Sequence, residues 1–93
     1  MSLEIKVELN IINKLGLHAR AAAKLASTAG KYGCTIKTGP TPDKLVDSKS
    51  VMSLMLLAAS QGTALHFYFD GADAEKAHRD IAKLLADRFD EEQ

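Results

Sequence analysis

The sequence predicts a single domain over residues 1–93 with an α/β (α+β) fold, in which three helices cover one face of a four-stranded antiparallel sheet. Two observations lead to this fold class. The strand-like segments alternate between apolar and polar residues, so each strand buries only one face, as antiparallel sheets often do. The helix-like segments are amphipathic and fall between the strands in the order β-α-β-β-α-β-α, which places the helices against the apolar face of the sheet.

Four segments read as strands. Residues 5–9 alternate, with Ile5, Val7 and Leu9 on one face, and residues 63–69 alternate in the same way. The second face of the latter strand carries His66 and Tyr68, which we expect on the open side of the sheet. Residues 34–38 and 44–47 form a predicted hairpin across a turn at residues 39–43, where two prolines lack the N–H that a sheet needs.

Three segments read as helices, over residues 19–29, 51–57 and 74–88. The first is rich in alanine, a strong helix former, and Gly30 or Gly33 is expected to end it. The expected core positions of the three helices are Ala22, Leu25, Ala26, Ala29, Leu54, Leu57, Ala77, Ile81, Leu84 and Leu85. Residues 90–93 read as a solvated acidic end.

Composition excludes several classes of function. Twelve acidic and twelve basic residues give a formal net charge of zero, which argues against binding nucleic acid, because such binding relies on neutralising several phosphates. The one cysteine, Cys34, has no internal partner for a disulfide. The sequence shows no signal-peptide pattern and no apolar run of membrane-spanning length. We therefore expect a cytoplasmic protein without membrane insertion.

His18 occupies a position with chemical consequences, because it stands at the entry to the alanine-rich helix. The first turn of a helix carries unpaired N–H groups and a partial positive charge. An anion held on His18 would face these groups, and Arg20 could add a charge-assisted bond. A neutral imidazole is also a fair nucleophile near neutral pH. The segment can therefore hold a transient phosphohistidine, although a histidine at a helix start can also serve as a capping residue alone.

Other chemistries fit the sequence less well. The spacings that separate His18, His66 and His78 match no compact metal-ligand motif, so we expect no metal site. No nucleophile-elbow sequence, dinucleotide glycine pattern or phosphate-binding P-loop is present, so we expect no hydrolase triad and no nucleotide or other cofactor.

The second predicted helix is apolar on more than one face. Ser50 is placed to cap it, and Leu54 and Leu57 are assigned to the core. The remaining apolar side chains would form an exposed patch, which is typical of a docking surface, unless the helix is wholly buried. This predicted patch consists of Val51, Met52, Met55 and Leu56.

Three motifs in order, Gly16-Leu17-His18-Ala19-Arg20, Lys49-Ser50-Val51-Met52 and Gln61-Gly62-Thr63, resemble the HPr family. HPr proteins are histidine-containing phosphocarriers of the bacterial phosphoenolpyruvate-dependent phosphotransferase system. The segment 13–16 and the tail 88–92 look more like NPr, the paralogue of the nitrogen-related branch. Ala21 departs from the family, which usually has proline there; proline would fix φ in the first turn, so alanine gives a looser start.

The resemblance implies an open-faced sandwich fold and assigns roles to individual residues. His18 would accept a phosphoryl group from phospho-enzyme I and pass it to a histidine of an EIIA-type protein, while Arg20 and the backbone N–H groups of Ala19 and Arg20 hold the phosphate. Ser50 corresponds to a serine that a dedicated kinase phosphorylates in some bacteria. The implied docking residues are Leu17, Lys24, Lys49, Val51, Met52, Met55 and Leu56. We expect a monomer. Two alternatives remain open: a non-catalytic regulator switched by phosphorylation of His18 or Ser50, and a small structural module.

Overall fold

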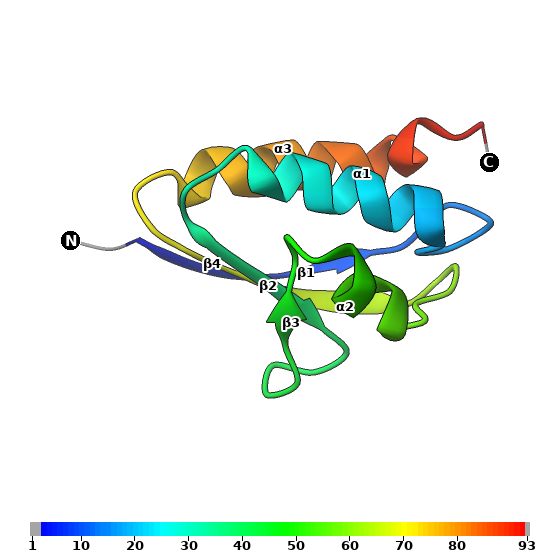
Figure 1. Ribbon diagram of the computed structural model, residues 1–93, viewed down its shortest axis with the longest axis horizontal. Helices are drawn as coiled ribbons and strands as arrows, with labels where there is room; N and C mark the ends of the chain where they lie inside the picture. The colour runs from blue at the N-terminus through cyan, green and yellow to red at the C-terminus, as the bar shows by residue number, and fades with distance from the viewer. Residues whose placement is uncertain (1–2, 93) are drawn as a thin grey trace.

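The computed structural model describes residues 3–92 and contains one sheet and three α-helices (Figure 1). The elements in chain order are β1 (Glu4–Asn10), α1 (Ala19–Gly30), β2 (Thr35–Gly39), β3 (Val46–Asp47), α2 (Val51–Leu56), β4 (Ala64–Asp70), α3 (Ala74–Ala86) and a 3-10 turn η1 (Arg88–Asp90). This order confirms the predicted β-α-β-β-α-β-α arrangement.

The sheet has the strand order β1-β4-β2-β3, and every neighbouring pair is antiparallel. In β4, Leu65, Phe67 and Phe69 are buried, whereas the residues between them are only half-buried. The predicted alternation of apolar and polar residues in β4 therefore reflects a sheet with only one covered face. His66 and Tyr68 lie on the other face, where they help to line a shallow hollow of about 600 Å³.

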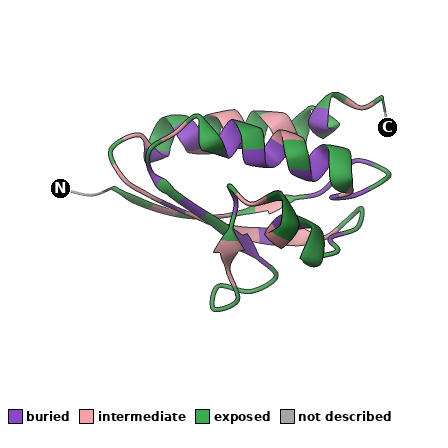
Figure 2. Cartoon of the chain, viewed as in Figure 1, coloured by how far each residue is buried: buried purple, intermediate pink, exposed green. Residues whose placement is uncertain are grey.

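Helices α1 and α3 lie side by side over the covered face of the sheet, and α2 lies next to α1 (Figure 1). Purple, buried segments of α1 and α3 face the sheet in Figure 2, while their outer faces are green. The buried residues of α1 are Ala21, Ala22, Leu25, Ala26, Thr28 and Ala29. Small side chains on this face allow the helix backbone to approach the sheet closely. All of the core positions predicted for the helices are buried, apart from Leu57 and Leu84, which are partly buried against the core.

Several element boundaries differ from prediction. Strand β3 is only two residues long, because Pro40 and Pro42 precede it in a turn that cannot extend the ladder. Helix α1 ends at Gly30, and Lys31 caps it in a right-handed conformation. Helix α3 stops at Ala86, two residues earlier than expected.

The chain after α3 corrects the prediction of a solvated acidic end. The residues of η1 have φ values of +56°, +54° and +63°, so the backbone forms a left-handed turn there. Phe89 is fully buried within this turn, and it anchors the segment against α1 and α3. Glu91 is thereby brought to the start of α1 and is only partly exposed, whereas Asp90 and Glu92 remain exposed as predicted.

Candidate functional site

The loop before His18 positions this residue at the start of α1. Gly16 adopts a left-handed φ of +68°, and a Cβ atom there would lie 2.5 Å from the carbonyl oxygen of Ala59. The N–H of Leu17 donates to that same carbonyl oxygen at 2.8 Å. The side chain of Asn13, which is fully buried, donates to the carbonyl oxygen of Gly16 at 2.8 Å. Glycine at position 16 is therefore required both for the turn and for the close approach of the two loops.

His18 is the N-cap residue of α1, as one reading of the sequence predicted. Its backbone is extended, its carbonyl oxygen accepts from the N–H of Ala22 at 2.8 Å, and its Nδ1 accepts from the N–H of Arg20 at 3.3 Å. The ring is partly exposed, with 26% of the side chain accessible. Nδ1 therefore faces the positive end of the helix while the ring stays within reach of solvent.

The opposite ring nitrogen, Nε2, contacts a carboxylate oxygen of Glu91. An ionised carboxylate only accepts hydrogen bonds, so this contact assigns the hydrogen of a neutral ring to Nε2 and leaves a lone pair on Nδ1. The second oxygen of Glu91 accepts from the Asn13 amide at 3.0 Å. Burial raises the pKa of Glu91, but hydrogen bonds from His18 and Asn13, with attraction from Arg20, outweigh it and hold that pKa below its ordinary value.

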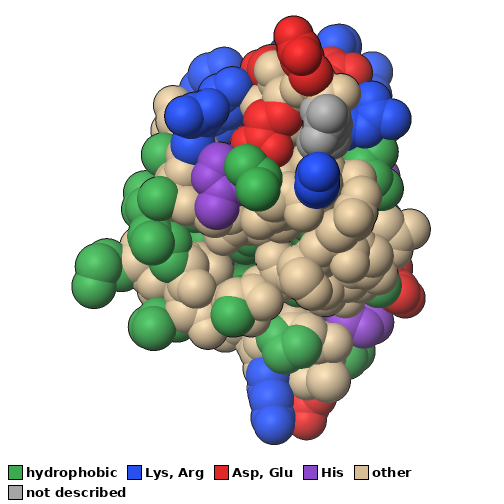
Figure 3. Space-filling view, turned by 90° about the vertical axis from the view of Figure 1, so that its right-hand side faces the viewer, with side chains coloured by type: hydrophobic (Ala, Val, Ile, Leu, Met, Phe, Trp, Pro, Cys, Tyr) green, Lys and Arg blue, Asp and Glu red, His purple; other side chains and the backbone are tan. Residues whose placement is uncertain are grey.

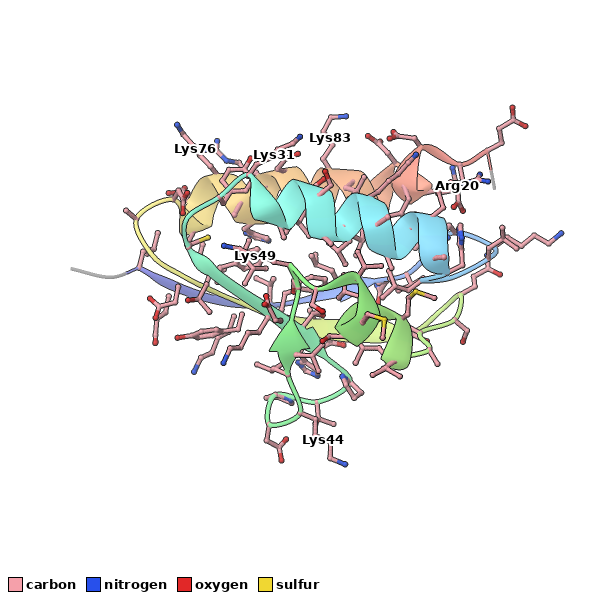
Figure 4. All side chains as sticks on the ribbon, in the orientation of Figure 1. Arg20, Lys31, Lys44, Lys49, Lys76 and Lys83 are labelled. Atoms are coloured by element: carbon pink, nitrogen blue, oxygen red, sulfur yellow. The ribbon has the colours of Figure 1, made fainter. Side chains whose placement is uncertain are left out.

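Basic side chains gather at the same end of the molecule. Arg20 is exposed and points toward the C-terminal segment (Figure 4). Lys24 donates from Nζ to the carbonyl oxygen of Phe89 at 2.7 Å and lies 3.7 Å from a carboxylate oxygen of Asp90. A shallow hollow of about 510 Å³ opens here, and its walls are Lys14, Leu15, Arg20, Lys24, Asp90, Glu91 and Glu92. Lys24 thus ties down the tail in addition to adding charge to the site.

The structure separates two residues from the predicted docking set. Leu17 is only 4% exposed, because its side chain joins the core beneath the loop, so it offers little surface to a partner. Lys49 donates from Nζ to the backbone oxygen of Tyr32 at 2.7 Å. Tyr32 follows the C-terminal end of α1, whereas His18 lies at the N-terminal end, and Figure 4 shows Lys49 well away from Arg20. Leu17 therefore adds almost no exposed surface beside His18, and Lys49 lies at a distance from it, so the docking role of Lys49 beside α2 stays a prediction.

The predicted apolar patch on α2 is exposed. Met52 and Leu56 are 75% and 82% exposed, and Val51 and Met55 are exposed to a smaller extent, while Leu54 is buried. Ser50 is the N-cap of α2, and its hydroxyl oxygen accepts from the N–H of Ser53 at 3.2 Å. The structure thus excludes a wholly buried helix and leaves these four side chains free to contact a partner.

Sequence reasoning missed four residues near the site. Ile12 and Leu15 are exposed on the loop before His18, with Leu15 at 68%, so they extend the apolar surface toward the histidine. Their position in a loop gave no periodic pattern to read. Asn13 and Glu91 were missed because their contact joins residues 78 positions apart. Figure 3 views the molecule from the end where α1 begins, and acidic, basic and hydrophobic side chains surround a histidine in the upper part of that view.

No group of three or more metal-ligating side chains is placed to hold a metal ion within residues 3–92. Over the same range, no helix is long and apolar enough to cross a membrane.

A partly exposed histidine caps the first helix of an open-faced sandwich, which is the arrangement that the resemblance to small phosphocarrier domains predicted. Residues 5–87 match the family model PTS-HPr, described as the PTS HPr component phosphorylation site, and the chain belongs to this HPr family of the phosphotransferase system.

Individual relatives support this membership. The chain is 48% identical to phosphocarrier protein HPr of Pseudomonas aeruginosa over 85 residues, which cover 91% of this chain and 94% of that protein. It is 36% identical to phosphocarrier protein NPr of Shewanella violacea over 88 residues, or 95% and 96% of the two chains. A crystal structure of HPr-C-His from Thermoanaerobacter tengcongensis superposes with a TM-score of 0.88 at 37% identity, covering 96% of this chain and 99% of that one. The predicted family and the predicted fold are confirmed.

Proposed function

We propose that this protein accepts a phosphoryl group on Nδ1 of His18 from the phosphohistidine of enzyme I and passes it to a histidine of an EIIA-type protein. The observation that carries the proposal is the orientation of the ring. Nδ1 faces the first turn of α1, and Nε2 is held by Glu91, so only Nδ1 offers a lone pair to an incoming phosphorus.

Phosphoryl transfer needs little covalent assistance beyond in-line positioning and stabilisation of charge. His18 supplies the nucleophile. The N–H of Ala19 lies in the first turn, where the backbone supplies no acceptor, and the N–H of Arg20 is released from Nδ1 when phosphorus bonds there. Both N–H groups can then donate to the phosphoryl oxygens. The exposed guanidinium of Arg20 adds a mobile, charge-assisted donor.

Partner docking is assigned to the exposed apolar patch of Val51, Met52, Met55 and Leu56, extended by Leu15. Methionine side chains adapt their shape at low cost, which suits a surface that must fit both a donor and an acceptor. Arg20 and Lys24 border the histidine and should attract an acidic partner surface, which affects the rate of encounter more than the lifetime of the complex. A carrier must release each partner, so we propose a monomer with small, transient interfaces.

Ser50 is proposed as a second, regulatory phosphorylation site for a serine kinase. A phosphate there would lie at the start of α2, next to Val51, and would place negative charge at the edge of the apolar patch. The expected result is weaker docking with an intact helix. We place the protein in the cytoplasm, where its partners and a reduced Cys34 would be found.

The proposal is tested by incubating the protein with enzyme I and labelled phosphoenolpyruvate, followed by measurement of acid-labile label. His18→Ala should take up none, whereas His66→Ala, which alters a histidine on the open sheet face, should match the wild type. Arg20→Ala should fold normally and accept label more slowly. Acid-labile label on His18→Ala at the wild-type level would refute the assignment of His18, and no label on the wild type would refute the carrier function.

A further inference from the structure

We propose that Glu91 is a positioning residue for phosphoryl transfer, because its carboxylate holds the His18 ring in the tautomer and orientation that present Nδ1 to the donor. This inference rests on the proposed function of His18 and adds a role for the C-terminal segment. It starts from the contact between Glu91 and Nε2, which brings together two residues 73 positions apart.

Both carboxylate oxygens of Glu91 are held by the loop that carries the nucleophile. One oxygen contacts Nε2 of His18, and the other accepts from the amide of Asn13 at 3.0 Å. The same amide donates to the carbonyl oxygen of Gly16 at 2.8 Å, and Asn13 is fully buried. Because Asn13 cannot rotate away without losing both contacts, the carboxylate has a fixed partner on each side. A chance surface contact would not be expected to have this second support.

The turn before Glu91 positions the Glu91 side chain next to the His18 loop. Arg88, Phe89 and Asp90 all adopt left-handed backbone conformations, which are unfavourable for residues with side chains. The fully buried Phe89 ring and the 2.7 Å bond from Lys24 to the Phe89 carbonyl oxygen hold this turn in place. Only 13% of the Glu91 side chain is exposed, so its interaction with His18 is partly shielded from water. The fold therefore holds a strained turn, and this turn places the Glu91 carboxylate beside His18.

The chemistry of transfer explains what this position does. The Nδ1 lone pair forms a bond to phosphorus, the bond from phosphorus to the donor's ring nitrogen breaks, and its electron pair returns to that nitrogen. Nε2 keeps its hydrogen, so the His18 ring gains positive charge during the step. Glu91 faces that charge from the Nε2 side, while the phosphoryl group forms on the other nitrogen, beside the N–H of Arg20. A carboxylate that orients histidine through one nitrogen while the other reacts is an established arrangement in hydrolases.

Other charges face the same region and must be considered together with Glu91. Lys14, Arg20 and Lys24 are basic, and Asp90 and Glu92 are acidic. Lys24 is engaged with the η1 turn, whereas the exposed side chain of Arg20 forms no ion pair within residues 3–92. Of the two carboxylates that end the described chain, Glu91 makes both contacts to the His18 loop, and Glu92 is exposed. Glu92 therefore offers a matched control at the adjacent position.

The first readout uses the protein alone. At about pH 8.5, well above the ordinary imidazole range, the nitrogen-15 chemical shifts of the His18 ring report which nitrogen carries the hydrogen. The wild type and Glu92→Gln should show hydrogen predominantly on Nε2. Glu91→Ala should shift the ring toward a mixture of both tautomers, and Glu91→Gln, which keeps an acceptor oxygen, should stay nearer to the wild type.

The second readout is the single-turnover rate of phosphoryl uptake from a phosphorylated enzyme I, measured at several donor concentrations. Glu91→Ala should lower the maximal rate about tenfold to hundredfold, with little change in the concentration for half-saturation, because docking is unaffected. Glu91→Gln should fall between, and Glu92→Gln should match the wild type. Equal rates for the wild type, Glu91→Ala and Glu91→Gln would overturn the inference, and so would an unchanged tautomer in Glu91→Ala. In either case wild-type labelling would leave the carrier function standing, whereas an unlabelled wild type would refute that function itself.

Discussion

Replacing Phe89 with alanine tests whether the C-terminal turn is docked as described. Phe89 is fully buried, and truncating a buried phenylalanine usually costs about 3–5 kcal/mol, including the cavity that remains. Here the loss should be smaller, because a terminal turn can detach instead of leaving a cavity. Detachment also relieves the left-handed backbone of the η1 turn, which offsets part of the loss. We therefore expect the free energy of unfolding to fall by about 2–3 kcal/mol.

The assay is urea unfolding followed by far-ultraviolet circular dichroism, with the loss read from the midpoint at an unchanged slope. For a domain of this size, the change corresponds to a melting temperature lower by roughly 10–20 °C. Leu56→Ala is the control, since Leu56 is 82% exposed and its truncation should change stability by less than about 0.5 kcal/mol. A loss below about 0.5 kcal/mol for Phe89→Ala would show that the turn is not packed, and the placement of Glu91 would lose its support.

Three further predictions concern the packing and hydrogen bonds of the domain. Asp73 accepts hydrogen bonds from the backbone N–H groups of Gly33 and Cys34, and these bonds together with the Cys34 thiol lower the pKa of Asp73. The wild type should therefore be more stable than Asp73→Asn at pH 7 and should lose this advantage as the pH falls below about 4. An equal advantage at pH 7 and pH 3 in urea unfolding would contradict this. Burial raises the pKa of the Cys34 thiol to about 11, so a thiol-exchange reagent at about pH 8 should modify it far more slowly in the native protein than in urea, and equal rates would be contrary evidence. Gly16→Ala should destabilise the protein by about 1–3 kcal/mol and slow phosphoryl uptake, because a Cβ atom meets the Ala59 carbonyl, whereas Gly30→Ala, where nothing lies within 4 Å, should not destabilise it.

Much of the fold was predictable because its signals are local. The alternation of Leu65, Phe67 and Phe69 identifies one buried strand face without reference to the rest of the chain. The alanine-rich segment after His18 forms a helix by intrinsic preference, and this places the histidine at its N-cap. The exposed apolar patch on α2 was one of two predictions for a segment that is apolar on several faces, and the exposure of Met52 and Leu56 decides between them.

The parts of the site that escaped prediction depend on contacts between distant segments. Nothing local in Phe89, Asp90 and Glu91 indicates a left-handed turn, and an acidic end is usually solvated. The turn exists because a pocket between α1 and α3 accepts the Phe89 ring, which only the assembled fold provides. The burial of Leu17 was not predicted for a related reason. It stands two residues after the exposed Leu15 and directly before His18, but the Gly16 turn directs its side chain into the core.

The central claim is that the phosphoryl group resides on Nδ1 of His18, and the position of the phosphorus–nitrogen bond tests it most directly. The protein should be labelled with nitrogen-15 in its histidine rings, phosphorylated through enzyme I and phosphoenolpyruvate, and examined for one-bond coupling between phosphorus and each ring nitrogen. We expect coupling to Nδ1 of His18. Coupling to Nε2, or to a ring nitrogen of another histidine, would contradict the account.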